Sequence, residues 1–169
     1  MMQFLQSFRL LSVALICSVA VAAQGQTDMV GKAAPAFVRS DLNRRQVDIN
    51  EYRGKIVLLN FWATWCTTCQ IELPEFEAWQ KKYGEDILKV ITVSMDDSDV
   101  PVRKIVRRLH LDLPVVMGEP KLGQAYGGIL GLPVTFLIDR EGKIAAQFKG
   151  ETDPRRIEAD VKRLLSSPL

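Results

Sequence analysis

Residues 60–69 read NFWATWCTTC and hold a Cys-x-x-Cys pair, Cys66 and Cys69. The pair follows the apolar run 56–59 and precedes a helical pattern. Cys66 is therefore predicted at a helix N-terminus, where free N–H groups and the helix dipole favour an anion. Cys69 comes one turn later on the same face, within disulfide range. Because the thiolate is the reactive form of cysteine, this spacing predicts a redox-active pair. The alternatives are a structural disulfide and half of a zinc site.

The N-terminus has the features of a secretory signal peptide. Residues 1–9 carry one positive charge and no acid, and residues 10–23 are almost wholly apolar and end in small side chains. This pattern predicts cleavage after Ala22 or Ala23. The apolar part is shorter than the roughly 20 residues that cross a bilayer. We expect residues 1–23 to be removed and the protein to be periplasmic or otherwise extracytoplasmic. The alternative is a membrane tether formed by an uncleaved N-terminal segment.

Cysteine and histidine usage argues against a metal centre. The only other cysteine, Cys17, lies in the apolar signal segment, and His110 is the only histidine. Structural zinc sites usually draw four ligands from these two residue types, so we predict no metal and no cofactor. An exported chain left with two cysteines three residues apart is also not a disulfide-stapled scaffold.

The composition indicates one ordinary globular domain, residues 24–169. The chain has 169 residues, a net charge of +2 and 25% charged residues, so nothing suggests a nucleic-acid partner. The basic segment 103–109 is most simply a solvated helix face, with a docking patch as the minority interpretation. We expect a monomer.

The order of predicted elements indicates an α/β fold with a mixed central sheet flanked by helices. Proline inside the first helix, Pro74, predicts a kink, and Asp99 and Asp153 are expected to cap the later helices. The expected strands are 36–38, 46–49, 55–61, 87–94, 114–117, 134–138 and 144–148, and the expected helices are 67–83, one from residue 99, 121–126 and one from residue 153.

Two segments carry a family resemblance: FWATWCTTC at 61–69 and GLPVTFLID at 131–139. Together they resemble thioredoxin-fold proteins, and more closely the TlpA/ResA branch of exported thiol-disulfide oxidoreductases. The N-terminal hairpin 31–54 and the helix-strand insertion 97–118, which ordinary thioredoxin lacks, match that branch. Glu72 matches the acidic residue of its active-site helix. The resemblance implies a thioredoxin-like fold with these two additions.

The resemblance also implies roles near the thiols. Cys66 would be the nucleophile and Cys69 the resolving thiol of a redox-active disulfide. Glu72, three residues on, would be a partly buried carboxylate that manages the proton of the pair, the alternative being an exposed helix glutamate. Thioredoxin has a buried aspartate where this chain has Asn60, and an amide accepts no proton at neutral pH. Glu72 is therefore the nearest candidate.

Three residues are expected to bind the substrate. Pro133 resembles the cis-proline that packs beside the cysteines in thioredoxin-like folds, and a cis bond would turn the Leu132 backbone toward an incoming peptide strand. Trp65 resembles an exposed peptide-contact residue, whereas Trp62 is expected in the core.

Departures from the family pattern lie beside the thiols. The dipeptide Thr67-Thr68 lacks the usual proline, Val134 replaces a frequent threonine or glutamate, and the approach 127–130 is one residue longer. These changes leave the reduction potential and the client preference open.

The resemblance implies a thiol-disulfide oxidoreductase that acts as a reductant. Electrons would come from a membrane thiol donor and pass to disulfides of exported clients such as apocytochrome c. One alternative is a disulfide-forming oxidant, which would need a cation beside Cys66 that Thr67-Thr68 does not supply. A peroxiredoxin-like peroxidase is another, but its Pro-x-x-x-Thr-x-x-Cys setting is absent. A non-enzymatic binding scaffold would not need both cysteines.

Overall fold

Strand β3 (Ile56–Trp62) lies in the middle of the sheet because nearly all of its side chains are apolar on both faces. All seven of its residues are buried, and Asn60 is the one polar residue among them. Predominantly apolar runs of this kind are typical of strands covered on both sides. Strand β3 pairs in parallel with β4 (Leu88–Ser94) on one side and antiparallel with β6 (Val134–Ile138) on the other. Its carboxyl end leads directly into the Cys-x-x-Cys segment.

The computed structural model describes residues 28–167, so the predicted signal segment 1–23 lies outside the described residues. The five-stranded sheet has the order β5-β4-β3-β6-β7, and a separate two-stranded hairpin pairs β1 with β2. The remaining elements are β1 (Val38–Ser40), β2 (Gln46–Asp48), the short 3-10 helix η1 (Ile49–Tyr52), α1 (Thr67–Tyr83), α2 (Asp99–Arg108), β5 (Val115–Met117), α3 (Pro120–Ala125), β7 (Ile144–Lys149) and α4 (Pro154–Ser166).

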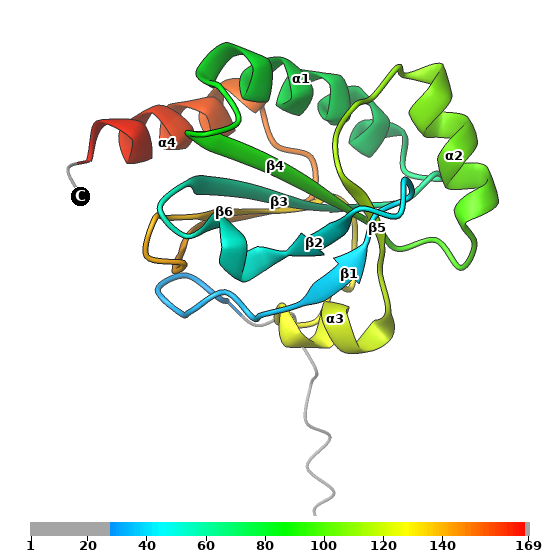
Figure 1. The fold of residues 1–169 in the computed structure, drawn as a ribbon, viewed down its shortest axis with the longest axis horizontal. Coiled ribbons are helices and arrows are strands. Elements are labelled where there is room, and N and C mark those ends of the chain that lie inside the picture. Colours follow the sequence, from blue (N-terminus) through cyan, green and yellow to red (C-terminus); the bar gives the residue numbers. More distant parts are fainter. Residues whose placement is uncertain (1–27, 168–169) are drawn as a thin grey trace, which may run out of the picture.

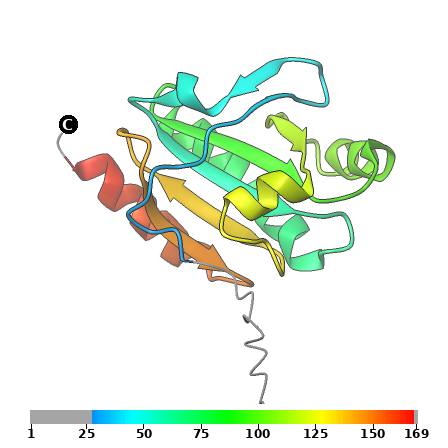
Figure 2. The ribbon, with the colours of Figure 1, turned by 90° about the horizontal axis from the view of Figure 1, so that it is seen from below.

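The sheet is covered on both faces, as predicted. Helices α1 and α4 lie over one face, and α3 and the β1–β2 hairpin lie over the other (Figure 1). Figure 2 shows α3 and the chain leading into β1 crossing this second face. Alternate residues of β3 pack into two hydrophobic cores, one on each face of the sheet. Ile56 and Leu58 pack with α1 and α4, whereas Val57, Leu59 and Phe61 pack on the hairpin side. This alternation confirms a mixed sheet flanked by helices.

The predicted insertion is present as α2 and β5 at the edge of the sheet. Strand β5 pairs in parallel with β4. The N-terminal hairpin reaches the same edge, because the Leu42 N–H donates to the Val115 carbonyl at 2.9 Å. The buried Asp41 carboxylate accepts the backbone N–H groups of Asn43 and Arg45, each at 2.8 Å, and so closes the hairpin loop.

The structure changes several predicted boundaries. Ser98, not Asp99, caps α2, because its hydroxyl accepts the Val100 N–H while Asp99 lies in the first turn. Asp153 caps α4 as predicted. Helix α3 begins one residue earlier than expected, at Pro120, whose fixed φ suits a first helical position. Helix α1 continues through Pro74 as one helix.

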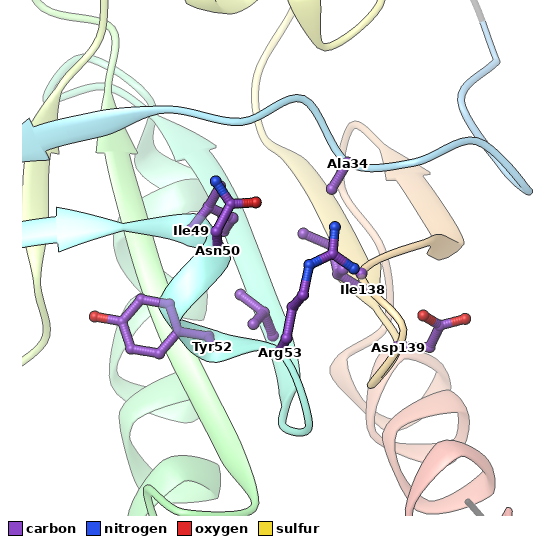
Figure 3. A pocket seen from close by; sticks show the side chains of 9 residues that line it. Ala34, Ile49, Asn50, Tyr52, Arg53, Ile138 and Asp139 are labelled. Atoms are coloured by element: carbon purple, nitrogen blue, oxygen red, sulfur yellow. The ribbon is translucent and has the colours of Figure 1, made fainter.

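A small cavity lies at the amino-terminal end of β3, the opposite end from the cysteines. Arg53 extends between the segment carrying Asn50 and Tyr52 and the end of β6 at Ile138 (Figure 3), and its guanidinium donates to the Glu141 carbonyl. The cavity volume of about 10 Å³ is at the lower limit for one water molecule. It therefore offers no room for a ligand larger than one water molecule. Within residues 28–167 no helix has the length and apolar character to cross a membrane.

Gly118 follows β5 in a place with no room for a side chain. A Cβ there would lie 2.6 Å from the Met95 sulfur and 2.9 Å from the Ser94 carbonyl oxygen. The methionine can move but the backbone of β4 cannot, so Gly118→Ala should lower the free energy of unfolding by about 1–3 kcal/mol. Gly131→Ala is the control, because its Cβ would meet nothing within 4 Å. Urea unfolding of the oxidised proteins measures both, and equal midpoints would contradict this packing.

Candidate active site

The two cysteines lie at the junction between β3 and α1. Cys66 is the N-cap of α1, with extended backbone angles, and its sulfur accepts the Cys69 N–H at 3.2 Å. The pair forms a disulfide with an S–S distance of 2.03 Å and a Cα–Cα distance of 5.3 Å. The predicted helix N-terminal position of Cys66 is confirmed. Free N–H groups at such a site stabilise a thiolate once the bond is reduced.

The two cysteine residues differ in their access to solvent. Cys66 retains 7% exposure and Cys69 none. Both belong to an apolar cluster that also includes Trp62, Leu73 and Val102. Cys69 is therefore covered by the protein, and Cys66 is the residue nearer to solvent.

Glu72 is buried on α1, one turn beyond Cys69. Only 2% of its surface is exposed, so the alternative of an exposed helix glutamate is wrong. Burial raises the pKa of Glu72 from 4.5 to about 7, opposed by a hydrogen bond from the Thr152 backbone and supported by the charge of Glu151. Its Oε2 atom has no hydrogen-bond partner among the described residues. The carboxyl group is thus able to gain or lose a proton near neutral pH.

Asn60 is fully buried on β3, two residues before Trp62 and on the same face of the strand. Its Nδ2 group donates to the Thr135 hydroxyl at 2.9 Å, while its Oδ1 atom has no partner among the described residues. The amide carries no titratable proton, so Asn60 cannot exchange one with the cysteines.

The fold brings the segment before β6 to the cysteines. Val134 pairs with Phe61 near the carboxyl end of β3, so the preceding Pro133 lies at the same end of the sheet. The Leu132–Pro133 bond is cis, as predicted. Pro133 is buried, and Leu132 packs against the apolar cluster that contains Cys66 and Cys69.

Apolar side chains are exposed around this site. Trp65 is 71% exposed and Trp62 is fully buried, as predicted for both. Two further apolar residues, Ile71 on α1 and Leu130 before the cis bond, are 65% and 70% exposed and were not predicted. These side chains are exposed because of the direction in which α1 and the 127–131 segment face in the fold. Helical or strand periodicity alone does not predict that direction.

Sequence reasoning also missed a set of polar residues that contact the chain just before Cys66. The Asp96 carboxylate, after β4, accepts hydrogen bonds from the Thr64 N–H and hydroxyl. Gln70 donates to the Thr64 carbonyl and accepts from Arg108, which comes from α2. An acidic residue at the carboxyl end of a predicted parallel strand was the one available signal, because such ends meet at one edge of a sheet.

His110 does not join the site. It follows α2 as an exposed residue with a φ of 53°. Among the residues that the structure describes, no group of three or more His, Cys, Asp or Glu side chains is placed to hold a metal ion.

The comparisons with known proteins agree with this geometry. Residues 30–147 match the AhpC/TSA family. The thiol-disulfide oxidoreductase ResA of Bacillus thuringiensis subsp. konkukian is 35% identical over 136 residues, which cover 80% of this chain and 78% of that protein. This chain belongs to the AhpC/TSA family and is of the ResA type. The ResA of Geobacillus thermodenitrificans is 36% identical over 139 residues, or 82% of this chain and 77% of that protein.

A solved structure supports the same ResA-type assignment. The thioredoxin domain of a thiol-disulfide oxidoreductase from Bacteroides vulgatus superposes with a TM-score of 0.69 at 26% identity, covering 80% of this chain and 99% of that one. The protein is therefore a thiol-disulfide oxidoreductase with a thioredoxin-like fold, as predicted. The family match alone would also fit a peroxidase, but the ResA-type relatives select the oxidoreductase.

Burial of Glu72 predicts a pH-dependent stability. The unfolded chain ionises this group near pH 4.5, whereas the folded protein keeps it protonated up to about pH 7. The folded state is therefore not penalised below pH 4.5, and the penalty grows to about 3 kcal/mol as the pH passes 7. Glu72→Gln should gain stability over wild type across that window, measured by urea unfolding of the disulfide form.

The matched control is Glu75→Gln, because Glu75 is exposed on the same helix. Its stability should follow that of wild type at every pH. A Glu72→Gln advantage that is the same at pH 4 and pH 8 would show that the buried carboxyl does not titrate as described.

Proposed function

We propose that this ResA-type protein reduces disulfides in exported client proteins, with Cys66 as the attacking thiol. The observation that carries the proposal is the asymmetry of the pair. Cys66 caps a helix on the solvent side, and Cys69 is fully buried one turn inside. A client sulfur can approach Cys66 but not Cys69, so the exchange with a client begins at Cys66.

The reaction proceeds by two thiol–disulfide exchanges. The Cys66 thiolate attacks one sulfur of the client disulfide, an S–S bond forms between protein and client, and the first client sulfur leaves as a thiolate that takes a proton. Cys69, after losing its proton, attacks the Cys66 sulfur and releases the second client thiolate. The client gains two electrons and two protons, and the Cys66–Cys69 disulfide forms.

Glu72 is proposed to accept the proton of Cys69. It lies one turn beyond Cys69 on the same face of α1, and its pKa of about 7 lets it exchange protons at neutral pH.

Client docking is assigned to the apolar surface beside Cys66. Trp65 offers an exposed ring, and the Leu132–Pro133 segment lies against the cysteine cluster. An extended client segment can pair with the backbone at Leu132 as an added strand, which brings its cysteine to Cys66. This mode needs little client sequence specificity.

The location and partners complete the proposal. Residues 1–23 would direct export as a signal peptide and then be removed. The mature protein would lie outside the cytoplasm, where clients such as apocytochrome c acquire disulfides. A membrane thiol protein would re-reduce the Cys66–Cys69 disulfide. The protein would act as a monomer and without a cofactor.

Trapping tests the roles of the two thiols. In the reduced protein, Cys66 should be alkylated faster than Cys69, as measured by mass mapping of both cysteine peptides. Cys69→Ser should accumulate mixed disulfides with exported proteins because nothing resolves them, and Cys66→Ser should not. Equal trapping by the two variants, or faster labelling of Cys69, would reverse the assigned roles.

The reduction potential tests the direction of electron flow. A reductant should have a value nearer the roughly −270 mV of thioredoxin than the roughly −120 mV of DsbA. Equilibration with glutathione or dithiothreitol buffers measures it, and a peroxide-consumption assay is run beside it. A potential near that of DsbA would favour the disulfide-forming oxidant, and rapid peroxide turnover would favour the peroxidase.

A further inference from the structure

Thr64, two residues before Cys66, is held by the carboxylate of Asp96. Oδ2 of Asp96 accepts the Thr64 N–H at 2.9 Å, and Oδ1 accepts the Thr64 hydroxyl at 2.6 Å. The Ser94 hydroxyl donates to Oδ2 at 2.8 Å and fixes the carboxylate at the end of β4. Thr64 is thus tied to the central sheet by a charged acceptor, and hydrogen bonds of this kind are stronger than neutral ones.

The remaining backbone group of Thr64 is held from the other side. Its carbonyl accepts the Gln70 side-chain amide at 2.6 Å, and the Gln70 oxygen accepts the guanidinium of Arg108. Gln70 lies one turn beyond Cys66 on α1, and Arg108 is the last residue of the insertion helix α2. Thr64 is therefore held directly by the segment after β4 and by α1, and α2 supports the α1 contact through Arg108.

We propose that Asp96 and Gln70 are positioning residues for Cys66, which act by clamping Thr64 from both sides. The proposal rests on the role of Cys66 as the attacking thiol. We call Ser94, Asp96, Thr64, Gln70 and Arg108 the Thr64 clamp.

The clamp matters most when the disulfide is open. In the oxidised protein the S–S bond itself restrains Cys66. After reduction that covalent restraint is gone, and Cys66 is then held by its own backbone hydrogen bonds with Ala63 and Gln70 and by the backbone that precedes it. Trp65 cannot hold that preceding backbone by packing because its side chain is 71% exposed. The hydrogen bonds to Thr64 restrain it, and a thiolate gains from the helix N–H groups only when Cys66 keeps its place at the helix N-terminus.

Removal of Asp96 would shift the ionisation of the Cys66 thiol in opposite directions, depending on whether Asp96 acts through its charge or by positioning Cys66. As a nearby negative charge alone, Asp96 would disfavour a thiolate at Cys66, and its removal would ease ionisation. As a positioning residue it favours the thiolate, and its removal would hinder ionisation. The other charged groups near the site are unchanged in an Asp96 variant; they include Glu72 on α1, Glu151 before α4 and Arg108 from α2.

The test is the pH profile of Cys66 alkylation in the reduced full-length protein, with both cysteines followed by mass mapping. Asp96→Ala should move the midpoint to higher pH and slow alkylation at pH 7 by about tenfold, the scale expected for a misplaced reacting group. Asp97→Ala is the control, because Asp97 is exposed and no contact to Thr64 is seen. It should leave the midpoint unchanged or move it slightly lower. Asp96→Asn keeps an acceptor oxygen and should restore fast alkylation.

A second pair of variants guards against a folding defect in Asp96→Ala. Thr64→Val removes only the hydroxyl donor, and it should shift the midpoint in the same direction by a smaller amount. Thr64→Ser keeps the hydroxyl and should behave as wild type. A midpoint in Asp96→Ala that moves lower, or that coincides with the wild-type midpoint, would overturn the clamp. Faster labelling of Cys69 than Cys66 in wild type would instead overturn the role of Cys66.

Discussion

Burial of β3 on both faces is the constraint on which the rest of the molecule depends. Because Val57, Leu59 and Phe61 need cover on one side and Ile56 and Leu58 on the other, helices and hairpin must enclose the strand. That enclosure puts the carboxyl end of β3 at a protected edge, where the chain turns into α1. Both cysteines are held at this junction in the apolar cluster of Trp62, Leu73 and Val102, and Cys66 keeps a small exposed surface. The short segment after β3 therefore both packs into the core and contains the reactive cysteines.

The same burial that stabilises the fold shapes the reactive groups. A carboxyl group removed from water resists ionisation, so Glu72 titrates near neutral pH instead of near 4.5. The folded protein therefore loses stability as the pH rises above 4.5, and the buried carboxyl group can exchange a proton near neutral pH. Asn60, equally buried, is satisfied only through its amide nitrogen and carries no proton to exchange. Stability and reactivity are opposed at Glu72, and such opposition is expected at functional sites.

Much of this arrangement could be predicted because its signals are local. The apolar run before Cys66 indicated a central strand, and the i,i+3 cysteine spacing indicated a helix start. The family resemblance of the segment around Pro133 implied the cis bond that the structure contains. Prediction was weaker at caps, where Ser98 and Asp99 offer the same type of side chain and only the backbone angles choose Ser98. It failed for the exposed Ile71 and Leu130, because facing depends on how whole elements pack.

Residues close together in the chain thus determined the strand, the redox pair and the family, since helix starts, turns and disulfide reach are set within a few residues. Tertiary structure decided what surrounds the pair. Thr64 meets Asp96 across 32 positions, and Gln70 meets Arg108 across 38. No local pattern marks those contacts, because hydrogen bonds between distant segments form only after β4 and α2 have packed beside β3 and α1. The reactive cysteines therefore lie in one short segment of the sequence, and the contacts that position them come from the tertiary structure.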